Sequence, residues 1–285
     1  MLKIIKSNLT NLTHLTLVDC SNFLQSIRWE TLENLIHLDI YLENYDDDTG
    51  LKLSSLNKNI RYLRISGVVQ MNTAGISFYG AIGFPELIIL QFSGKSWDDS
   101  DLTAFRYFCK NSPKLEEIHI YGNLPSEEAY HTVYDSVAKS IGSLLNRPAL
   151  RILEIDIGEY HQQPQMFEES IKNLFEYPQE KPQLEKLILL PNLPIPSIYQ
   201  LVNENFNLKT LELRGRIRLE STTAIQNLMK IFKCDNGLEE IQFGLLYLYY
   251  NDEKSPWHDL AKRLTSKIHR HEFPKLIEFL ESFIH

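Results

Sequence analysis

The sequence has few cysteines, few glycines and no long apolar run, and each shortage excludes a class of protein. Its three cysteines, Cys20, Cys109 and Cys234, lie far apart and form neither a disulfide framework nor a zinc-binding pattern. Its 12 glycines form no phosphate-binding loop. No segment has the roughly 18 uninterrupted apolar residues that a membrane span needs. The whole chain is 43% apolar and 23% charged, which is the composition of an ordinary globular protein.

Basic residues are outnumbered as well. The 29 lysines and arginines face 37 acidic residues, which gives a net charge of −8. A chain with this charge repels nucleic-acid phosphate, so we expect no nucleic-acid partner. The N-terminal segment carries Lys3 and Lys6 between its apolar residues and is no signal peptide. We therefore expect a cytoplasmic or nuclear protein with no membrane partner.

Motifs of catalysis and cofactor binding are missing too. The nucleotide-binding, serine-hydrolase and metalloprotease signatures do not occur, so we expect no enzyme and no cofactor. Two histidines and one carboxylate, His14, His37 and Asp39, are spaced to share one face of neighbouring strands. Three such groups could hold zinc, but no fourth ligand is evident. We interpret them as an exposed polar surface and predict no metal site.

What the sequence does contain is a repeat. The pattern L-x-x-L-x-L, with apolar residues at all 27 defining positions, occurs nine times at intervals of 23 to 35 residues. Its copies begin at Leu12, Leu35, Ile60, Leu87, Leu115, Leu150, Leu184, Leu208 and Leu238. A tenth copy at Leu276 fails because Glu281 occupies the third apolar position. Such a period indicates stacked structural units.

Proline and asparagine recur just before the motif. Proline stands two residues before the first leucine at Pro85, Pro113, Pro148 and Pro182. Asparagine stands immediately before it at Asn11, Asn34, Asn59 and Asn207. Because proline cannot continue a helix and favours extended neighbours, the motifs predict strands that follow a helix or turn. Helical spacing between motifs predicts helices around Leu102–Phe108, Ala129–Leu144, Phe167–Leu174 and Ile225–Phe232.

The predicted fold is an α/β solenoid. Each unit contributes one short strand and a connection, and no single unit can bury its apolar face, so the units must stack. The alternative, an ordinary doubly wound sheet, does not explain one register shared nine times. We expect a right-handed arc with a parallel sheet on the concave face, helices on the convex face and about nine to ten irregular repeats. Residues 1–285 form one domain, and 245–285 cap its C-terminal end.

The chain resembles leucine-rich repeat proteins from about Leu12 to Leu280. The family's asparagine or cysteine at motif position nine occurs here as Cys20, Asn123 and Asn192. Repeat length varies more than in the regular subclass, and "CKNSPKLEEIHI" and "CDNGLEEIQF" resemble the repeats of fungal F-box proteins. In that family the repeats hold the substrate and the F-box recruits a ubiquitin-ligase scaffold. The resemblance implies a ligase scaffold as partner only if an F-box precedes Met1.

The concave face is the candidate binding site, because its rigid strands present side chains that the fold does not need. We expect it to bind a protein partner. The candidate contact residues are Tyr41, Tyr62, Arg64, His119, Tyr121, Ile152, Glu154 and Ile188, and we expect Ile152, Ile188 and Leu190 to form an exposed apolar strip. The alternative function is a leucine-rich repeat sensor or scaffold unrelated to ubiquitin, similar to the repeat domains of immune receptors or pathogen effectors.

Overall fold

The structure is a computed structural model. It describes residues 9–19, 24, 26–42, 52–67, 83–94, 99–122, 144, 147, 149–157, 184–189, 199, 202–203, 207–218 and 238–247.

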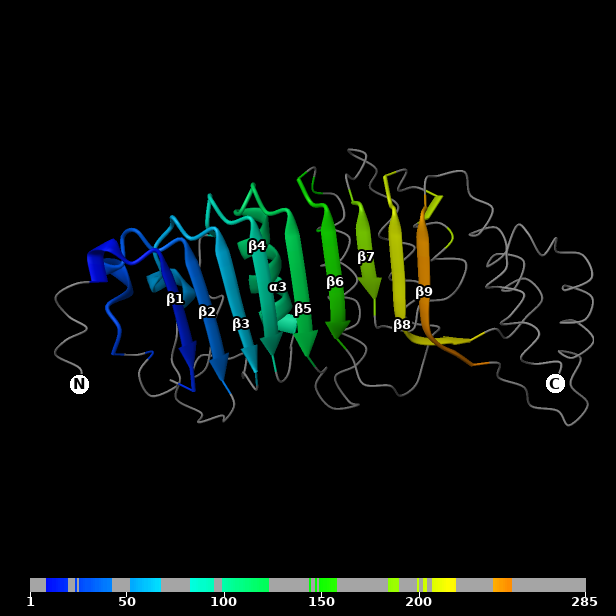
Figure 1. Ribbon diagram of the computed structural model, residues 1–285, viewed down its shortest axis with the longest axis horizontal. Helices are drawn as coiled ribbons and strands as arrows, with labels where there is room; N and C mark the ends of the chain where they lie inside the picture. The colour runs from blue at the N-terminus through cyan, green and yellow to red at the C-terminus, as the bar shows by residue number, and fades with distance from the viewer. Residues whose placement is uncertain are drawn as a thin grey trace, which may run out of the picture.

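One open parallel sheet organises these residues (Figure 1). Its strands lie side by side in chain order, and each pairs with its sequence neighbours. They are β1 (His14–Val18), β2 (His37–Leu42), β3 (Tyr62–Gly67), β4 (Ile89–Gly94), β5 (Glu117–Gly122), β6 (Ile152–Ile157), β7 (Lys186–Leu189), β8 (Thr210–Arg218) and β9 (Glu240–Tyr247). Every motif copy thus supplies a strand, and the predicted pairing of neighbours is confirmed. The arrangement is that of a solenoid-like α/β arc.

The register of the sheet follows the motif residue by residue. Leu38 of β2 pairs with Leu63 of β3, and Ile40 with Ile65, and all four side chains are at most 1% exposed. Side chains alternate between the two faces of a strand, so the motif's second and third apolar residues all point to one side. The same buried column continues through Leu90, Ile118, Leu153, Leu187 and Leu211. Burial of this apolar column is what stabilises the stack.

Backbone hydrogen bonds join each repeat to the next at the start of the strands. The carbonyl of Thr13 accepts the N–H groups of Ile36 and His37 at 2.9 and 3.0 Å, and the pattern recurs along the sheet. The later acceptors are the carbonyls of Ile36, Arg61, Ile88, Glu116, Arg151, Glu185 and Lys209. These paired bonds hold every strand in the same axial position as its neighbour.

Asparagines before the motif bridge successive repeats. The side-chain amide of Asn34 donates to the carbonyl of Thr10 at 2.6 Å, and that of Asn59 donates to Glu33 at 3.1 Å. Asn57 donates to the carbonyl of Leu32 at 2.8 Å. A turn carbonyl that would otherwise need water is satisfied by the next repeat. The recurrent asparagine therefore reflects contacts between repeats.

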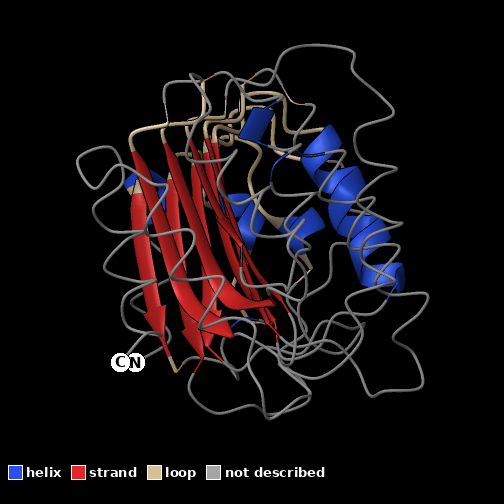
Figure 2. Ribbon diagram, turned by 90° about the vertical axis from the view of Figure 1, so that its right-hand side faces the viewer, coloured by secondary structure: helices blue, strands red, loops and turns tan. Residues whose placement is uncertain are grey.

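The one long helix among the described residues lies to one side of the sheet (Figure 2). The helix predicted around Leu102–Phe108 is confirmed as α3 (Asp99–Lys110), which buries Leu102, Phe105 and Phe108 to 2% exposure or less. Short 3-10 turns occur before β1, β2 and β3, at η1 (Leu9–Asn11), η2 (Trp29–Thr31) and η3 (Leu53–Ser55). The predicted helices at Phe167–Leu174 and Ile225–Phe232 lie outside the described residues, as does that at Ala129–Leu144 except for helical Leu144.

Polar contacts of Ser112, just after the helix, and of Arg147, from the next repeat, hold the end of α3. Ser112, which is fully buried, donates through its hydroxyl to the carbonyl of Phe108 and accepts from the backbone N–H of Phe84, both at 3.0 Å. The guanidinium of Arg147 donates to the carbonyls of Cys109 and Ser112. A cation at this position also interacts favourably with the negative end of the helix dipole.

The last two strands are longer than the motif predicts. β8 and β9 remain paired beyond the motif, from Arg216 with Leu245 to Arg218 with Tyr247, after a register shift between Leu213 and Arg216. The first three residues of the predicted C-terminal cap, 245–247, therefore belong to the sheet, and the rest of the cap lies outside the described residues. Within the described part of the chain, no helix is both long and apolar enough to cross a membrane.

Candidate functional site

The face of the sheet opposite the buried leucines carries the candidate site. We call it the strand face; it consists of the side chains at the first, third and fifth positions of each strand. Register pairs place His14, His37 and Tyr62 in one row across β1–β3. A second row contains Thr16, Asp39 and Arg64. Each strand is bonded to both neighbours from β2 to β8, so these rows are held rigidly.

Large apolar side chains are exposed at one end of this face. Val18 is 56% exposed, Tyr41 is 40% exposed and Tyr62 is 36% exposed. The fourth large apolar side chain exposed among the described residues, Tyr107, is 64% exposed and lies on α3. None of these four side chains is part of the buried core. Three of the four thus gather on β1–β3, and the expected exposure of Tyr41 and Tyr62 is confirmed.

Three aromatic rings stack along the first row. The rings of His14 and His37 lie 5.4 Å apart between centroids and are inclined by 21°, and His37 stacks on Tyr62 at 5.6 Å and 30°. The predicted proximity of the two histidines is confirmed. Stacked rings lie face to face, so their nitrogens do not converge on one point as zinc ligands must. Among the described residues, no group of three or more histidine, cysteine or carboxylate side chains could hold a metal ion.

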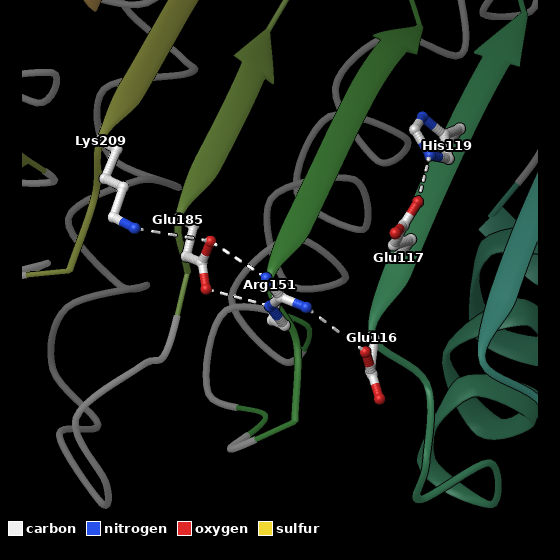
Figure 3. Close-up of polar contacts among 6 residues, drawn as sticks. All are labelled: Glu116, Glu117, His119, Arg151, Glu185 and Lys209. Carbon is white, nitrogen blue, oxygen red and sulfur yellow. Dashed lines mark hydrogen bonds and ion pairs between the residues drawn. The ribbon is translucent and has the colours of Figure 1, made fainter. Parts of the chain in front are cut away.

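His119 on β5 joins two carboxylates of the strand face. Its Nδ1 lies 2.8 Å from the Oε2 of Glu154 on β6, and its Nε2 lies 3.6 Å from the Oε2 of Glu117 (the latter pair drawn in Figure 3). Glu154 is only 6% exposed, and a buried carboxylate needs such partners to offset the loss of water. The arrangement fixes the His119 ring and leaves it partly exposed. His119 and Glu154 are thus brought together as register neighbours.

The apolar strip predicted on β6 and β7 is wrong as an exposed surface. Ile188 is only 4% exposed and Ile152 is partly buried, while Leu190 lies outside the described residues. The alternation rule gives the direction of a side chain but not how its neighbours cover it. Glu154, also predicted to contact a partner, is only 6% exposed and lies in hydrogen-bond contact with His119; its role in binding stays a prediction.

Charged residues just before the strands form a ladder that sequence reasoning missed (Figure 3). Arg151 donates to both carboxylate oxygens of Glu185, from Nε at 3.0 Å and from Nη2 at 3.2 Å. Its Nη1 lies 3.8 Å from the Oε2 of Glu116. Lys209 lies 4.0 Å from Glu185. The hydrogen bond from Arg151 lowers the pKa of Glu185, and the same bond raises the pKa of Arg151. All four residues occupy motif position two, where the sign of the charge alternates, so this column was the signal available in the sequence.

Cys109 is the one cysteine among the described residues, and its surroundings oppose a catalytic role. Its side chain is 1% exposed at the end of α3. Burial raises the pKa of its thiol to about 12, although the positive charge of Arg147 acts in the opposite direction. Only the thiolate is an effective nucleophile. Cys109 therefore packs as a small apolar residue.

Comparison with known proteins adds little to this description. No protein-family model matches the chain, and no curated protein matches it. Among solved structures, the chain is similar to the crystal structure of a Bacteroides fragilis protein from a structural genomics consortium, with 17% identity and a TM-score of 0.46 over 87% of this chain and 70% of that one. At this identity and TM-score the likeness assigns neither a function nor a partner.

We predict that the fold does not depend on a metal ion. A chelator such as EDTA should leave the melting temperature unchanged, because the stacked histidines offer no closed ligand set. The measurement is thermal unfolding with and without chelator, together with elemental analysis of the purified protein. Stoichiometric zinc would contradict the prediction and would make His14, His37 and Asp39 the first residues to replace.

Proposed function

We propose that this protein is a leucine-rich repeat solenoid without catalytic activity that holds a protein partner on its strand face. The observation that carries the proposal is the exposure of Tyr41, Tyr62 and Arg64 on a sheet that does not need them for its core. Tyrosine and arginine dominate the binding energy of many protein interfaces. The nearest functional analogy is the substrate-binding part of an F-box ubiquitin-ligase receptor, acting in the cytoplasm or nucleus. An F-box in frame before Met1 would extend the proposal to ligase recruitment.

Rigidity supports binding on this face. Backbone ladders fix each strand against its neighbours, so the side chains on them lose little conformational entropy when a partner binds. Nine strands at about 4.8 Å spacing make a face about 40 Å long. A face of this length accommodates a standard interface, which buries roughly 800 Å² on each partner.

The proposal predicts that the double variant Tyr62→Ala/Arg64→Ala loses its partner while keeping its fold. Each true hot spot should weaken binding by about 2 kcal/mol or more, because truncation removes contacts at the centre of the interface. The fold should persist, because both side chains are exposed. The measurement is a quantitative pull-down from cell extract, followed by titration of the partner it identifies. Tyr121 is left unchanged because it is half-buried and has interactions of its own.

A matched control is available on the other side of the molecule. The double variant Arg106→Ala/Tyr107→Ala removes the same two residue types from α3. It should recover the same partners as the wild type, and its melting temperature and circular dichroism should match those of the first variant. If the strand-face variant also recovers the same partners, the strand face is not the binding site. If only the α3 variant loses them, the helical side is the site.

A further inference from the structure

The strand face is not uniform along its length. On β1–β3 the side chains of His14, Val18, Tyr41, Tyr62 and Arg64 are all exposed. From β4 to β7 every described side chain on this face is half-buried or buried, down to 6% exposure at Glu154 and 4% at Ile188. The part of the face that a partner can reach most readily is therefore the patch on β1–β3. We call this set of residues the β1–β3 patch.

The patch contains the guanidinium of Arg64, which forms no ion pair with another described residue. Arg64 and Asp39 are register neighbours on β3 and β2, yet within the described part of the chain neither takes part in an ion pair. The contrast is Arg151, whose guanidinium binds Glu185 through two hydrogen bonds just before β6. Arg64 thus presents a planar set of donors to solvent beside exposed tyrosines, the geometry that suits a carboxylate.

Charge elsewhere on the face restricts where an acidic partner residue can lie. Glu117 lies on β5 and Glu154 on β6. Asp156, two residues after Glu154 on the same strand, adds a third carboxylate. A partner carboxylate placed over these strands would be repelled, whereas one placed over β3 meets Arg64. The strand face of β3 is therefore more favourable for an acidic partner residue than that of β5 or β6.

We propose that the β1–β3 patch binds a protein segment that carries an aspartate or glutamate against Arg64 and an aliphatic or aromatic side chain against Val18, Tyr41 and Tyr62. This inference rests on the proposed function and names the chemistry of the partner. The aromatic and aliphatic surfaces supply the apolar burial, and the carboxylate supplies the orientation. Asp39, one strand away, disfavours a second acidic residue beside the first.

The probe for this proposal is a random dodecapeptide library displayed on phage and selected on the immobilised full-length chain. We expect the enriched peptides to combine an acidic residue with apolar residues. Selected peptides are then synthesised and titrated by fluorescence anisotropy. Arg64→Gln should weaken their binding by about tenfold or more, and Arg64→Glu should weaken it further, because the loss of a charge-assisted hydrogen bond is compounded by repulsion. Circular dichroism checks that both variants are folded.

The control is Arg61→Glu, which makes the same charge change at an exposed arginine just before the same strand. It should alter affinity by about twofold or less, since long-range charge effects are screened by salt. Equal losses for the variants at positions 61 and 64, enriched peptides without acidic residues, or no enrichment would each overturn the proposal. The two proposals can fail separately. If the pull-down captures partners through Tyr62 and Arg64 but the selected peptides lack acidic residues, the proposed function stands and only this inference is removed.

Discussion

Replacing Leu153 or Leu187 by alanine is expected to lower the free energy of unfolding by about 2–5 kcal/mol. Both side chains are fully buried, and they pair with each other in the register of β6 and β7. Truncation removes apolar surface from the core and leaves a cavity that the packed neighbours fill only in part. The measurement is urea denaturation monitored by circular dichroism for each single variant.

Val18→Ala is the matched control for this experiment. Val18 lies on the strand face of β1 and is 56% exposed, so its truncation should change stability by about 0.5 kcal/mol or less. Losses below about 1 kcal/mol at both leucines would mean that they are not the core of the repeat. Repeat arrays can unfold in stages, so coincident transitions from fluorescence and circular dichroism establish that one free energy describes each variant.

The strands could be predicted from the sequence because burial imposes one rule on every repeat. An apolar residue must return to the same side of the sheet at motif positions one, four and six, and Leu35, Leu38 and Ile40 satisfy that rule as well as later copies do. A one-residue slip would turn the strand residues Leu38 and Ile40 to the other face, so the order of apolar residues determines the register. No comparable rule fixes the connections, where Trp29–Thr31 and Leu53–Ser55 form 3-10 turns and Asp99–Lys110 forms three turns of helix.

The candidate site could be predicted only in outline. Alternation correctly placed Tyr62, Arg64 and His119 on one face, and it placed His14 beside His37. The exposure of each residue depends instead on the size and direction of side chains on neighbouring strands and connections, which the motif does not encode. For this reason Ile188 was expected to be exposed and is buried.

Side-chain contacts between repeats were also difficult to predict, because the two residues of each pair lie one whole repeat apart in the chain. Arg151 and Glu185 are 34 residues apart, and His119 and Glu154 are 35 apart. Aligning the repeats by motif position brings each of these pairs into adjacent rows of one column. A charge that alternates down such a column, as at motif position two, predicts a ladder between repeats in the same way that apolar columns predict a core.

Glycine recurs at motif position eight, where Gly67, Gly94 and Gly122 stand. At Gly67 the structure shows why a residue without a side chain is needed. At Gly67 the backbone has a φ of +104°, a conformation that residues with a side chain rarely adopt. A Cβ added there would lie 2.0 Å from the carbonyl oxygen of Leu42, its register partner on β2. The absence of a side chain is what lets β2 and β3 end side by side.

Gly67→Ala is therefore expected to lower the free energy of unfolding by about 2–4 kcal/mol. The obstructing atom belongs to the backbone of a buried residue, so the clash can be relieved only by moving the end of a strand. The measurement is the urea midpoint of the variant relative to wild type. Ser66→Ala, one residue earlier, adds no atom and removes only a half-buried hydroxyl, so it should cost about 1 kcal/mol or less. Equal losses of stability at positions 66 and 67 would contradict the prediction, because the ends of β2 and β3 would then move apart at no cost in free energy. The close approach of these two strands would in that case contribute nothing to the rigidity on which binding at the strand face depends.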